Sequence, residues 1–257
     1  MEIISFDISG KFAHFRKYFT NNTALSFSIP PRTTIMGILA AICGLPKDSY
    51  YEVFSSNNID IGVDLLSRIK KTIHRLNLLK IESLSDFRGK NNHVQTPFEV
   101  VTDEDINKST ISYRIFLRPL DLDNEHYSNL KNLIKTKGNK FPLTLGIAGF
   151  NASISNYKEY DAFERKADNK FEYFNSAINA DDVLEIELLE EDGGRISIVE
   201  EELMPADFVA NNNREVKKMN RMLFSVSSSP LKARLKDTSA VIELTDGKTK
   251  ELIQFMR

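Results

Sequence analysis

The segment Ile35–Cys43 constrains this chain most, because its side chains are apolar nearly all round. A helix that is apolar on every side has to be enclosed by protein. The Pro30–Pro31 pair stiffens the approach, Thr33 or Thr34 can cap the free N–H groups of the first turn, and Gly44 can end the helix in a left-handed turn. The sequence therefore predicts a buried helix around which the other elements pack.

The N-terminal end of this helix is a candidate anion site. Arg32, Thr33 and Thr34 place a guanidinium and two hydroxyls beside the positive end of the helix dipole. Upstream, residues 12–19 interleave aromatic and basic side chains, a pattern suited to single-stranded nucleic acid. For each residue alone a structural role is the more common one, since such threonines are usually caps and such aromatic rings are usually buried under a loop.

Composition is that of a soluble globular protein: 257 residues, 41% hydrophobic and 27% charged, enough for one large or two smaller domains. No apolar run approaches the ~20 residues that span a bilayer, and the N-terminus lacks the pattern of a signal peptide. The single cysteine, Cys43, allows no intrachain disulfide, so we expect a cytoplasmic protein.

Charge is distributed unevenly although the net charge is only −2. Acidic residues gather in Asp181–Asp207, and basic residues gather in Arg68–Lys80, in Arg88–Lys90 and in Arg214–Lys236. A chain with separate acidic and basic surfaces can bind RNA locally despite a neutral total. The four histidines are scattered without metal-ligand spacing, and the sequence contains no P-loop or nucleophile elbow. We therefore expect no metal and no cofactor.

Periodicity predicts a β-α-β-β-α-β order in the first half, which is that of the ferredoxin-like split unit. The predicted strands alternate apolar and polar residues, and the second helix ends at Gly138. Residues 68–81 fit a helix or a strand. We favour a strand that pairs with Ile111–Leu117. A short helix capped by Asp48 or Ser49 is also expected through Phe54. The remaining predicted elements are strands Glu2–Ile8, Ile59–Leu65 and Leu143–Gly149 and the helix Asn124–Lys137.

The polar segment Ser83–Thr110 is too long for an ordinary hairpin turn, and insertions of this length are usually functional or disordered. We expect a projecting hairpin or flap. Residues 157–170 are expected to link the two halves. The second half is predicted to be mainly β, with a hairpin from Asp182–Leu189 to Arg195–Met204. Three further strands are expected at residues 222–226, 240–244 and 252–256.

Several of these segments together resemble a known family. The matching residues are Gly10, Ala13, Phe15-Arg16, Ser26-Phe27, Pro30–Thr34, Gly37, Gly44, Gln95-Thr96-Pro97, Arg114–Pro119 and Phe141–Gly146. This pattern resembles the Cas-five branch of the RAMP superfamily, found in type I CRISPR effector complexes, over roughly the first 150 residues. The resemblance implies an α+β fold: a ferredoxin-like (RRM-like) RAMP domain, 1–155, with an inserted β-hairpin thumb within flap 83–110. A smaller β-rich domain, 156–257, would follow.

The resemblance also implies a function. It implies a non-catalytic subunit of a Cascade complex, of subtype I-B or a relative, that holds the 5′ handle of the CRISPR RNA and caps the backbone filament. Its partners would be the RNA, the backbone subunit and the large subunit; contact with target DNA near the protospacer-adjacent motif stays open. Carried over by position, the RNA-binding residues would be Arg16, Lys17, Tyr18, Arg32, Thr33, Thr34, Arg88, Lys90, Asn92, His93, Gln95 and Arg114.

Two alternatives stay open. A metal-free endoribonuclease needs a base, an acid and cations for the phosphate, and one subtype of the resembled family processes repeat RNA in this way. The candidate residues for that chemistry are His14, Lys17, Tyr18, Lys90 and His93. The other alternative is a ferredoxin-like enzyme or interaction domain unrelated to RNA, with a pocket lined by the acidic second half.

Overall fold

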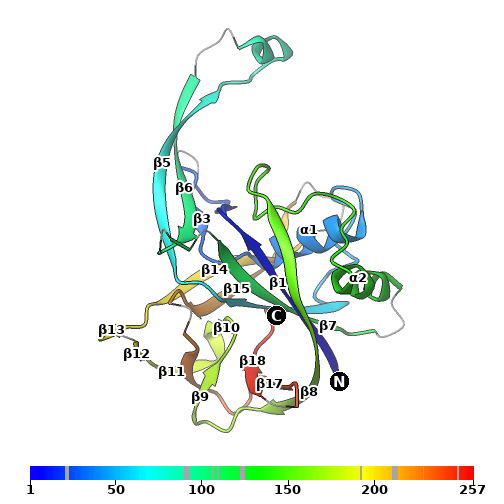
Figure 1. Ribbon diagram of the computed structural model, residues 1–257, viewed down its shortest axis with the longest axis vertical. Helices are drawn as coiled ribbons and strands as arrows, with labels where there is room; N and C mark the ends of the chain where they lie inside the picture. Colours follow the sequence, from blue (N-terminus) through cyan, green and yellow to red (C-terminus); the bar gives the residue numbers. More distant parts are fainter. Residues whose placement is uncertain are drawn as a thin grey trace.

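The computed structural model describes residues 1–20, 23–89, 93–105, 107–108, 110–121, 125–191, 193–209, 214–227, 229–247 and 249–257. Two α-helices and eighteen strands lie within these ranges, so the fold is mixed and strand-rich (Figure 1). Within the same ranges, no helix is both long and apolar enough to cross a membrane.

Four long strands form the centre of the molecule. They lie in the order β8 (Ala152–Lys166), β1 (Glu2–Gly10), β7 (Ile111–Pro119) and β4 (Ile59–Leu65), each antiparallel to its neighbour. In the chain, α1 (Arg32–Cys43) connects β1 to β4, and α2 (Glu125–Lys135) connects β7 to β8. Both helices pack on one face of these strands, over apolar side chains at alternate positions.

The other face of the central strands is covered by the C-terminal half. The sheet continues past β8 through β17 (Ala240–Thr245), β18 (Lys250–Ile253), β9 (Phe171–Phe174), β16 (Leu231–Leu235) and β11 (Val183–Glu187). Phe116 of β7 packs in one cluster with Ile242 of β17 and Ile253 of β18. The strands of both halves therefore belong to one nine-stranded sheet. Within it, β1 and β7 are covered by the helices on one face and by the C-terminal strands on the other.

Smaller elements complete the fold. A three-stranded sheet is formed by β10 (Ile178–Asn179), β15 (Val216–Ser225) and β14 (Val199–Phe208). Two short pairs join β2 (Phe15–Arg16) to β3 (Ser26–Phe27) and β12 (Glu190–Glu191) to β13 (Arg195–Ile196). The 3₁₀ turns are η1 (Leu84–Arg88) and η2 (Ala180–Asp182).

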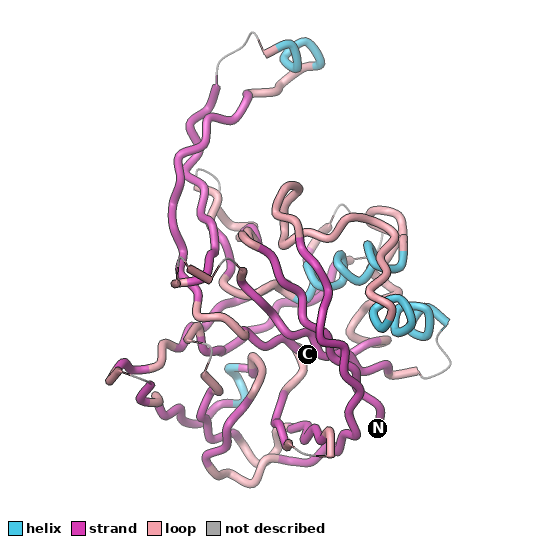
Figure 2. Tube along the Cα trace, viewed as in Figure 1, coloured by secondary structure: helices cyan, strands magenta, loops and turns pink. Residues whose placement is uncertain are grey.

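A long two-stranded ribbon projects from this body (Figures 1 and 2). It is formed by β5 (Ile69–Leu79) and β6 (His93–Asp103), with η1 near its tip. The strand predicted for residues 68–81 is confirmed. Its predicted pairing with Ile111–Leu117 is wrong, because β7 is already hydrogen-bonded to β1 on one side and to β4 on the other. The predicted flap 83–110 contains the tip and one of the two strands of the ribbon.

Three local predictions are wrong. Residues 143–149 form a loop, because Gly146 and Gly149 adopt positive φ angles of 99° and 94° that interrupt an extended strand. Residues 157–170 are not a linker. Most of them belong to β8, which pairs with β1 and β17, and the charged sequence gave no sign of this pairing. Residues 48–54 form turns rather than a capped helix.

The C-terminal end of the buried helix α1 is as predicted from the sequence, but its N-terminal cap is not. Gly44 ends it in the left-handed conformation, with φ 78°, and donates its N–H to Ala40. At the other end the N-cap is Pro31, whose carbonyl accepts the N–H groups of Thr34 and Ile35. The predicted threonine cap is therefore wrong, and the threonine side chains are free for other contacts.

Two glycines of the loop after α2 allow a matched test of how tightly this loop packs against His14. A Cβ at Gly146 would overlap the carbonyl oxygen of His14, whereas a Cβ at Gly149 would meet no atom within 4 Å. Both residues have positive φ, so Gly149→Ala should cost only the backbone strain, about 1–2 kcal/mol. Gly146→Ala should destabilise by about 3 kcal/mol or more. Urea unfolding of the two variants measures the difference; equal losses would show that the loop yields freely.

Candidate nucleic-acid interface

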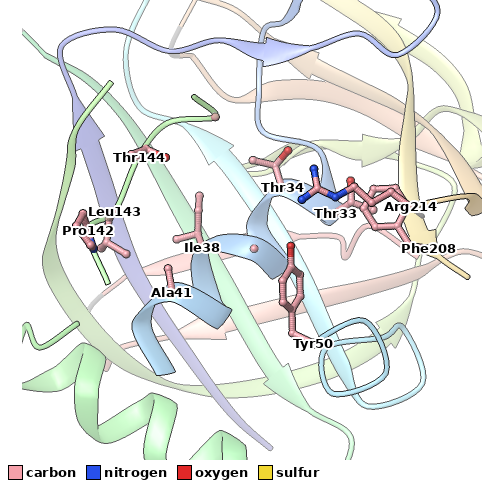
Figure 3. Close-up of a pocket in the computed structure, with 12 residues that line it drawn as sticks. Thr33, Thr34, Ile38, Ala41, Tyr50, Pro142, Leu143, Thr144, Phe208 and Arg214 are labelled. Carbon is pink, nitrogen blue, oxygen red and sulfur yellow. The ribbon is translucent and has the colours of Figure 1, made fainter. Parts of the chain in front are cut away.

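An open pocket of about 310 Å³ lies along one face of α1, from Thr33 to Ala41 (Figure 3). Its walls come from α1, the turns after α1, the loop after α2 and the segment that joins β14 to β15. The lining residues are Thr33, Thr34, Gly37, Ile38, Ala41, Tyr50, Pro142, Leu143, Thr144, Gly146, Phe208 and Arg214.

Small residues on one face of α1 create the space. Thr34, Gly37 and Ala41 follow one another at helical spacing and all line the pocket. A Cβ at Gly37 would meet the hydroxyl oxygen of Tyr50 at 3.1 Å, so the glycine lets this ring approach the helix. Burial raises the pKa of Tyr50, which keeps its hydroxyl protonated and able to donate a hydrogen bond.

Arg214 supplies a positive charge at the rim of the pocket. In Figure 3 its guanidinium reaches over the first turn of α1 toward Thr34. Its Nε donates to the Asp48 carboxylate at 3.0 Å, while 52% of the side chain stays exposed. Burial would lower the pKa of Arg214, but hydrogen bonds with Asp48 and Tyr51 outweigh it and raise the pKa. The pocket thus combines a permanent cation, hydroxyls, an aromatic ring and a helix N-terminus.

The predicted role of Arg32 as a phosphate ligand needs correction. Arg32 is 1% exposed, and its Nη1 donates to the Asp207 carboxylate at 2.6 Å. The same nitrogen donates to the carbonyl of Ala206, and Nη2 donates to the carbonyls of Phe54 and Ile59 at 2.9 and 2.8 Å. Protein groups therefore surround the guanidinium, and Arg32 holds α1 to neighbouring elements instead of facing a ligand.

The two threonines after Arg32 differ in access. Thr33 is 5% exposed, and its hydroxyl donates to the carbonyl of Pro205 at 3.5 Å. Thr34 is half-buried and lies in the pocket wall beside the guanidinium of Arg214 (Figure 3). Of the predicted pair, Thr34 is the residue whose hydroxyl a ligand can reach.

Residues 16–18 lie at the root of the ribbon. Arg16 is exposed, and Tyr18 is 55% exposed against the edge of Phe19. Lys17 is less available, because its ammonium lies 2.6 Å from the Glu202 carboxylate. In this group, Arg16 and Tyr18 fit the predicted RNA contacts better than Lys17.

One segment connects the root of the ribbon with the pocket. Ala13 exchanges backbone hydrogen bonds of 2.9 and 3.0 Å with Val101 of β6. The next residue, His14, donates its backbone N–H to the carbonyl of Leu145. Thr144 and Gly146, on either side of Leu145 in the chain, line the pocket. This buried segment therefore links the root of the ribbon to the loop that lines the pocket, and Arg16 and Tyr18 follow it in the chain as exposed residues.

The remaining predicted residues separate into three groups. Arg88, His93 and Gln95 are exposed on the distal part of the ribbon. Lys90 and Asn92 lie outside the described residues. Arg114 lies on the face of β7 that the C-terminal strands cover, and its Nε lies 2.8 Å from the Asp7 carboxylate. This position does not favour an RNA contact, and the role of Arg114 stays a prediction.

The two histidines proposed for metal-free catalysis lie in different parts of the structure. His14 is 1% exposed and stacks on Phe98 at 4.0 Å, with Nδ1 2.7 Å from the carbonyl oxygen of Glu99. Burial lowers the pKa of His14. Because it is buried, His14 is inaccessible to a substrate. His93 lies at the distal end of β6, whereas Ala13, next to His14, pairs with Val101 near the other end of the same strand. Within the described ranges, no cluster of histidine, cysteine and acidic residues has the arrangement of a metal site.

Sequence reasoning missed Tyr50, Thr144 and Arg214. Thr144 and Gly37 belong to the residues that carry the family resemblance, so that resemblance did include two walls of the pocket. Arg214 belongs to a basic run, but its approach to α1 depends on how β14 and β15 pack, which no local pattern reveals.

Comparison with known proteins connects this geometry to one family. Residues 3–125 match the model of a family described as CRISPR-associated protein (Cas_Cas5). This match covers α1, the ribbon and the strands β1, β4 and β7. Comparison with curated proteins gave no match.

Solved structures are similar to this chain at low sequence identity. The crystal structure of a CRISPR protein from Archaeoglobus fulgidus is 13% identical, with 98% of each chain covered and a TM-score of 0.56. A crystal structure of a Cas protein is 13% identical, with 88% of this chain and 95% of that chain covered and a TM-score of 0.44. A chain of a CRISPR RNA-guided surveillance complex is 10% identical, with 90% and 91% covered and a TM-score of 0.46. The first of these supports a common fold over the whole chain.

The buried position of Arg32 predicts a large effect on stability. Asp207→Ala would leave the Arg32 guanidinium buried without its counter-ion, which should cost about 3–5 kcal/mol in the free energy of unfolding. Glu187→Ala removes the partner of Lys232 in an exposed pair and should cost less than about 1 kcal/mol. Urea unfolding of both variants tests this contrast, and a loss below about 1 kcal/mol for Asp207→Ala would refute the structural role of the pair.

Proposed function

We propose that this protein is a non-catalytic RNA-binding subunit of a type I CRISPR effector complex that holds the 5′ handle of the CRISPR RNA. The observation that carries the proposal is the open pocket between α1 and Arg214, joined through residues 13–18 to the root of a projecting ribbon. The match of residues 3–125 to the CRISPR-associated family supports the same assignment.

We infer that β1, α1, β4, β7, α2 and β8 form a ferredoxin-like RAMP unit with the ribbon as its thumb. The strand order β8-β1-β7-β4 and the two helices on one face support this inference. The division into residues 1–155 and 156–257 and the subtype I-B stay predictions, and β8 crosses the proposed boundary without a break.

The pocket suits one nucleotide of a single-stranded RNA. Its volume lies near the lower end of the range for small-ligand sites, about 300–1,000 Å³. Arg214 can pair with a phosphate, and the hydroxyl of Thr34 and the positive end of α1 can contribute to the same anion site. Tyr50 and Phe208 provide aromatic surface for a ribose or base.

The ribbon has two chemically different faces, because side chains alternate along paired strands. On one face Asn77 lies opposite Gln95, and the neighbouring pairs on this face place Arg75 opposite Pro97 and His93 opposite Leu79. On the other face Leu78 lies opposite Val94, next to Leu76, and all three are exposed. We propose that the polar face contacts the RNA and the apolar face packs against the backbone subunit.

Ion pairs fix the ribbon at its root. Arg68 lies 2.6 Å from the Glu104 carboxylate and also pairs with Glu191. Lys71 on β5 lies 3.4 Å from the Glu202 carboxylate of β14. These contacts tie the ribbon to the body of the protein, so it can act as a semi-rigid arm that caps the end of a filament. Contacts with the large subunit and with target DNA stay predictions.

The pocket is tested by the salt dependence of RNA binding. Binding of a single-stranded handle RNA should weaken when Arg214→Gln removes one phosphate contact. The slope of log K against log salt should then flatten by about 0.7. Arg221→Gln is a matched control, since Arg221 is 50% exposed, also pairs with an aspartate, and lies on β15 away from the pocket lining.

Equal slopes for Arg214→Gln and the wild type would remove Arg214 from the RNA site. The same incubation carried out in EDTA reports on cleavage. Intact RNA is expected, and a discrete cut would favour the metal-free endoribonuclease instead.

The two faces of the ribbon make opposite predictions. Leu76→Asp combined with Leu78→Asp should abolish co-purification with the backbone subunit, because it places charges on the apolar face. The isolated subunit should keep its RNA affinity. Arg75→Gln combined with Asn77→Ala should weaken RNA binding and leave the protein contact in place. Size-exclusion chromatography of the complex and RNA titration of each variant measure both effects; identical behaviour of the two variants would refute the division of the faces.

A further inference from the structure

The nine-stranded sheet has two edges, and the described part of the chain covers only one of them. On β4, the carbonyl of Val63 accepts the N–H of Ala177 at 2.7 Å, and the carbonyl of Ile61 accepts the N–H of Met256 at 2.8 Å. At the opposite edge β11 pairs with β16 alone, and no other described strand joins it. Backbone N–H and C=O groups on the outer side of β11 are therefore available for a further strand.

The side chains along this edge are unusually apolar for an exposed strand. Leu184 and Ile186 on β11 are 48% and 38% exposed, and Leu188 directly after it is 50% exposed. Ile196 and Ile198 in the adjoining segment are 53% and 52% exposed. Monomeric proteins usually protect edge strands against pairing, so an open edge bordered by five exposed aliphatic residues has the character of a docking surface.

The charges at this edge decide between possible occupants. Residues 181–191 contain six acidic residues and no basic one. Glu185 and Glu187 pair with Arg234 and Lys232 on β16, yet their side chains stay 55% and 50% exposed. Antiparallel pairing of two copies of β11 would bring these carboxylates together across the strands, which is unfavourable. A strand with basic side chains would instead be attracted.

We infer that the β11 edge receives an extended segment of another protein, with apolar side chains at alternate positions and lysine or arginine between them. Backbone hydrogen bonds would supply affinity, and the aliphatic and acidic side chains would supply specificity. The inference is independent of the proposed RNA function, because β11 lies apart from α1, the ribbon and the pocket (Figure 1).

The test uses the full chain and the synthetic peptide Lys-Val-Lys-Val-Lys-Ile-Lys as a probe. Amide hydrogen exchange should slow at least tenfold within Val183–Glu187 when the peptide is bound. The acidic analogue Glu-Val-Glu-Val-Glu-Ile-Glu should give no protection. A version of the basic peptide with alternate amides N-methylated should give none either, because it cannot pair along its edge.

Variants identify the edge itself. Ile186→Lys should weaken peptide binding at least tenfold in fluorescence anisotropy, whereas Leu203→Lys, at a residue 48% exposed on β14, should leave it unchanged. If Ile186→Lys does not fold by circular dichroism, Leu188→Lys takes its place. Absence of protection, or equal effects of the edge and control variants, would overturn the inference. A dimer in sedimentation that Ile186→Lys dissolves would overturn it too, since the occupant would then be a second copy.

Discussion

The ion pair between Arg32 and Asp207 fixes the position of the helix on which the candidate site is built. A guanidinium enclosed by protein is stable only when its charge is paired and its N–H groups are satisfied. Asp207 provides the charge, and the carbonyls of Phe54 and Ile59 accept further hydrogen bonds. One side chain therefore joins the first turn of α1 to the start of β4 and to β14, three elements far apart in the sequence.

This arrangement explains why one face of α1 is buried and another is open. Ile35, Leu39 and Ile42 pack into the core, so the helix cannot rotate without losing that burial. The remaining face carries Thr34, Gly37 and Ala41, whose small side chains leave room above them. The open pocket is thus a consequence of fixing the helix from the other side. Arg214 can approach it because β14, which carries Asp207, leads the chain back past the same helix end.

The basic residues of the chain illustrate how tertiary context sorts equivalent side chains. Nothing in the local sequence shows which of Arg16, Arg32, Arg114 and Arg214 pairs with a carboxylate of the fold. Arg32 and Arg114 pair with buried carboxylates, whereas Arg16 and Arg214 remain exposed enough to meet a ligand. The partners Asp207 and Asp7 lie 175 and 107 residues away from the arginines they bind. Sequence spacing carries no information about such pairings, which is why the sequence could not show that Arg32 and Arg114 bind carboxylates of the fold.

The sequence alone determined the elements whose pattern is local. The all-round apolar run of α1, the glycine that ends it and the amphipathic pattern of α2 appear as expected. The strands β1, β4 and β7 also lie where alternation predicts them, although β1 and β4 are buried on both faces. The family resemblance of residues 10–146 is also a property of the sequence alone, because it rests on side chains at fixed spacing. Only the tertiary structure decided that β5 pairs with β6, that β8 is the longest strand rather than a linker, and that the pocket contains Tyr50 and Arg214. The physical reason is that helix periodicity and turn chemistry act between neighbours in the chain, whereas strand partners and buried charges are chosen by contacts between residues that only folding brings together.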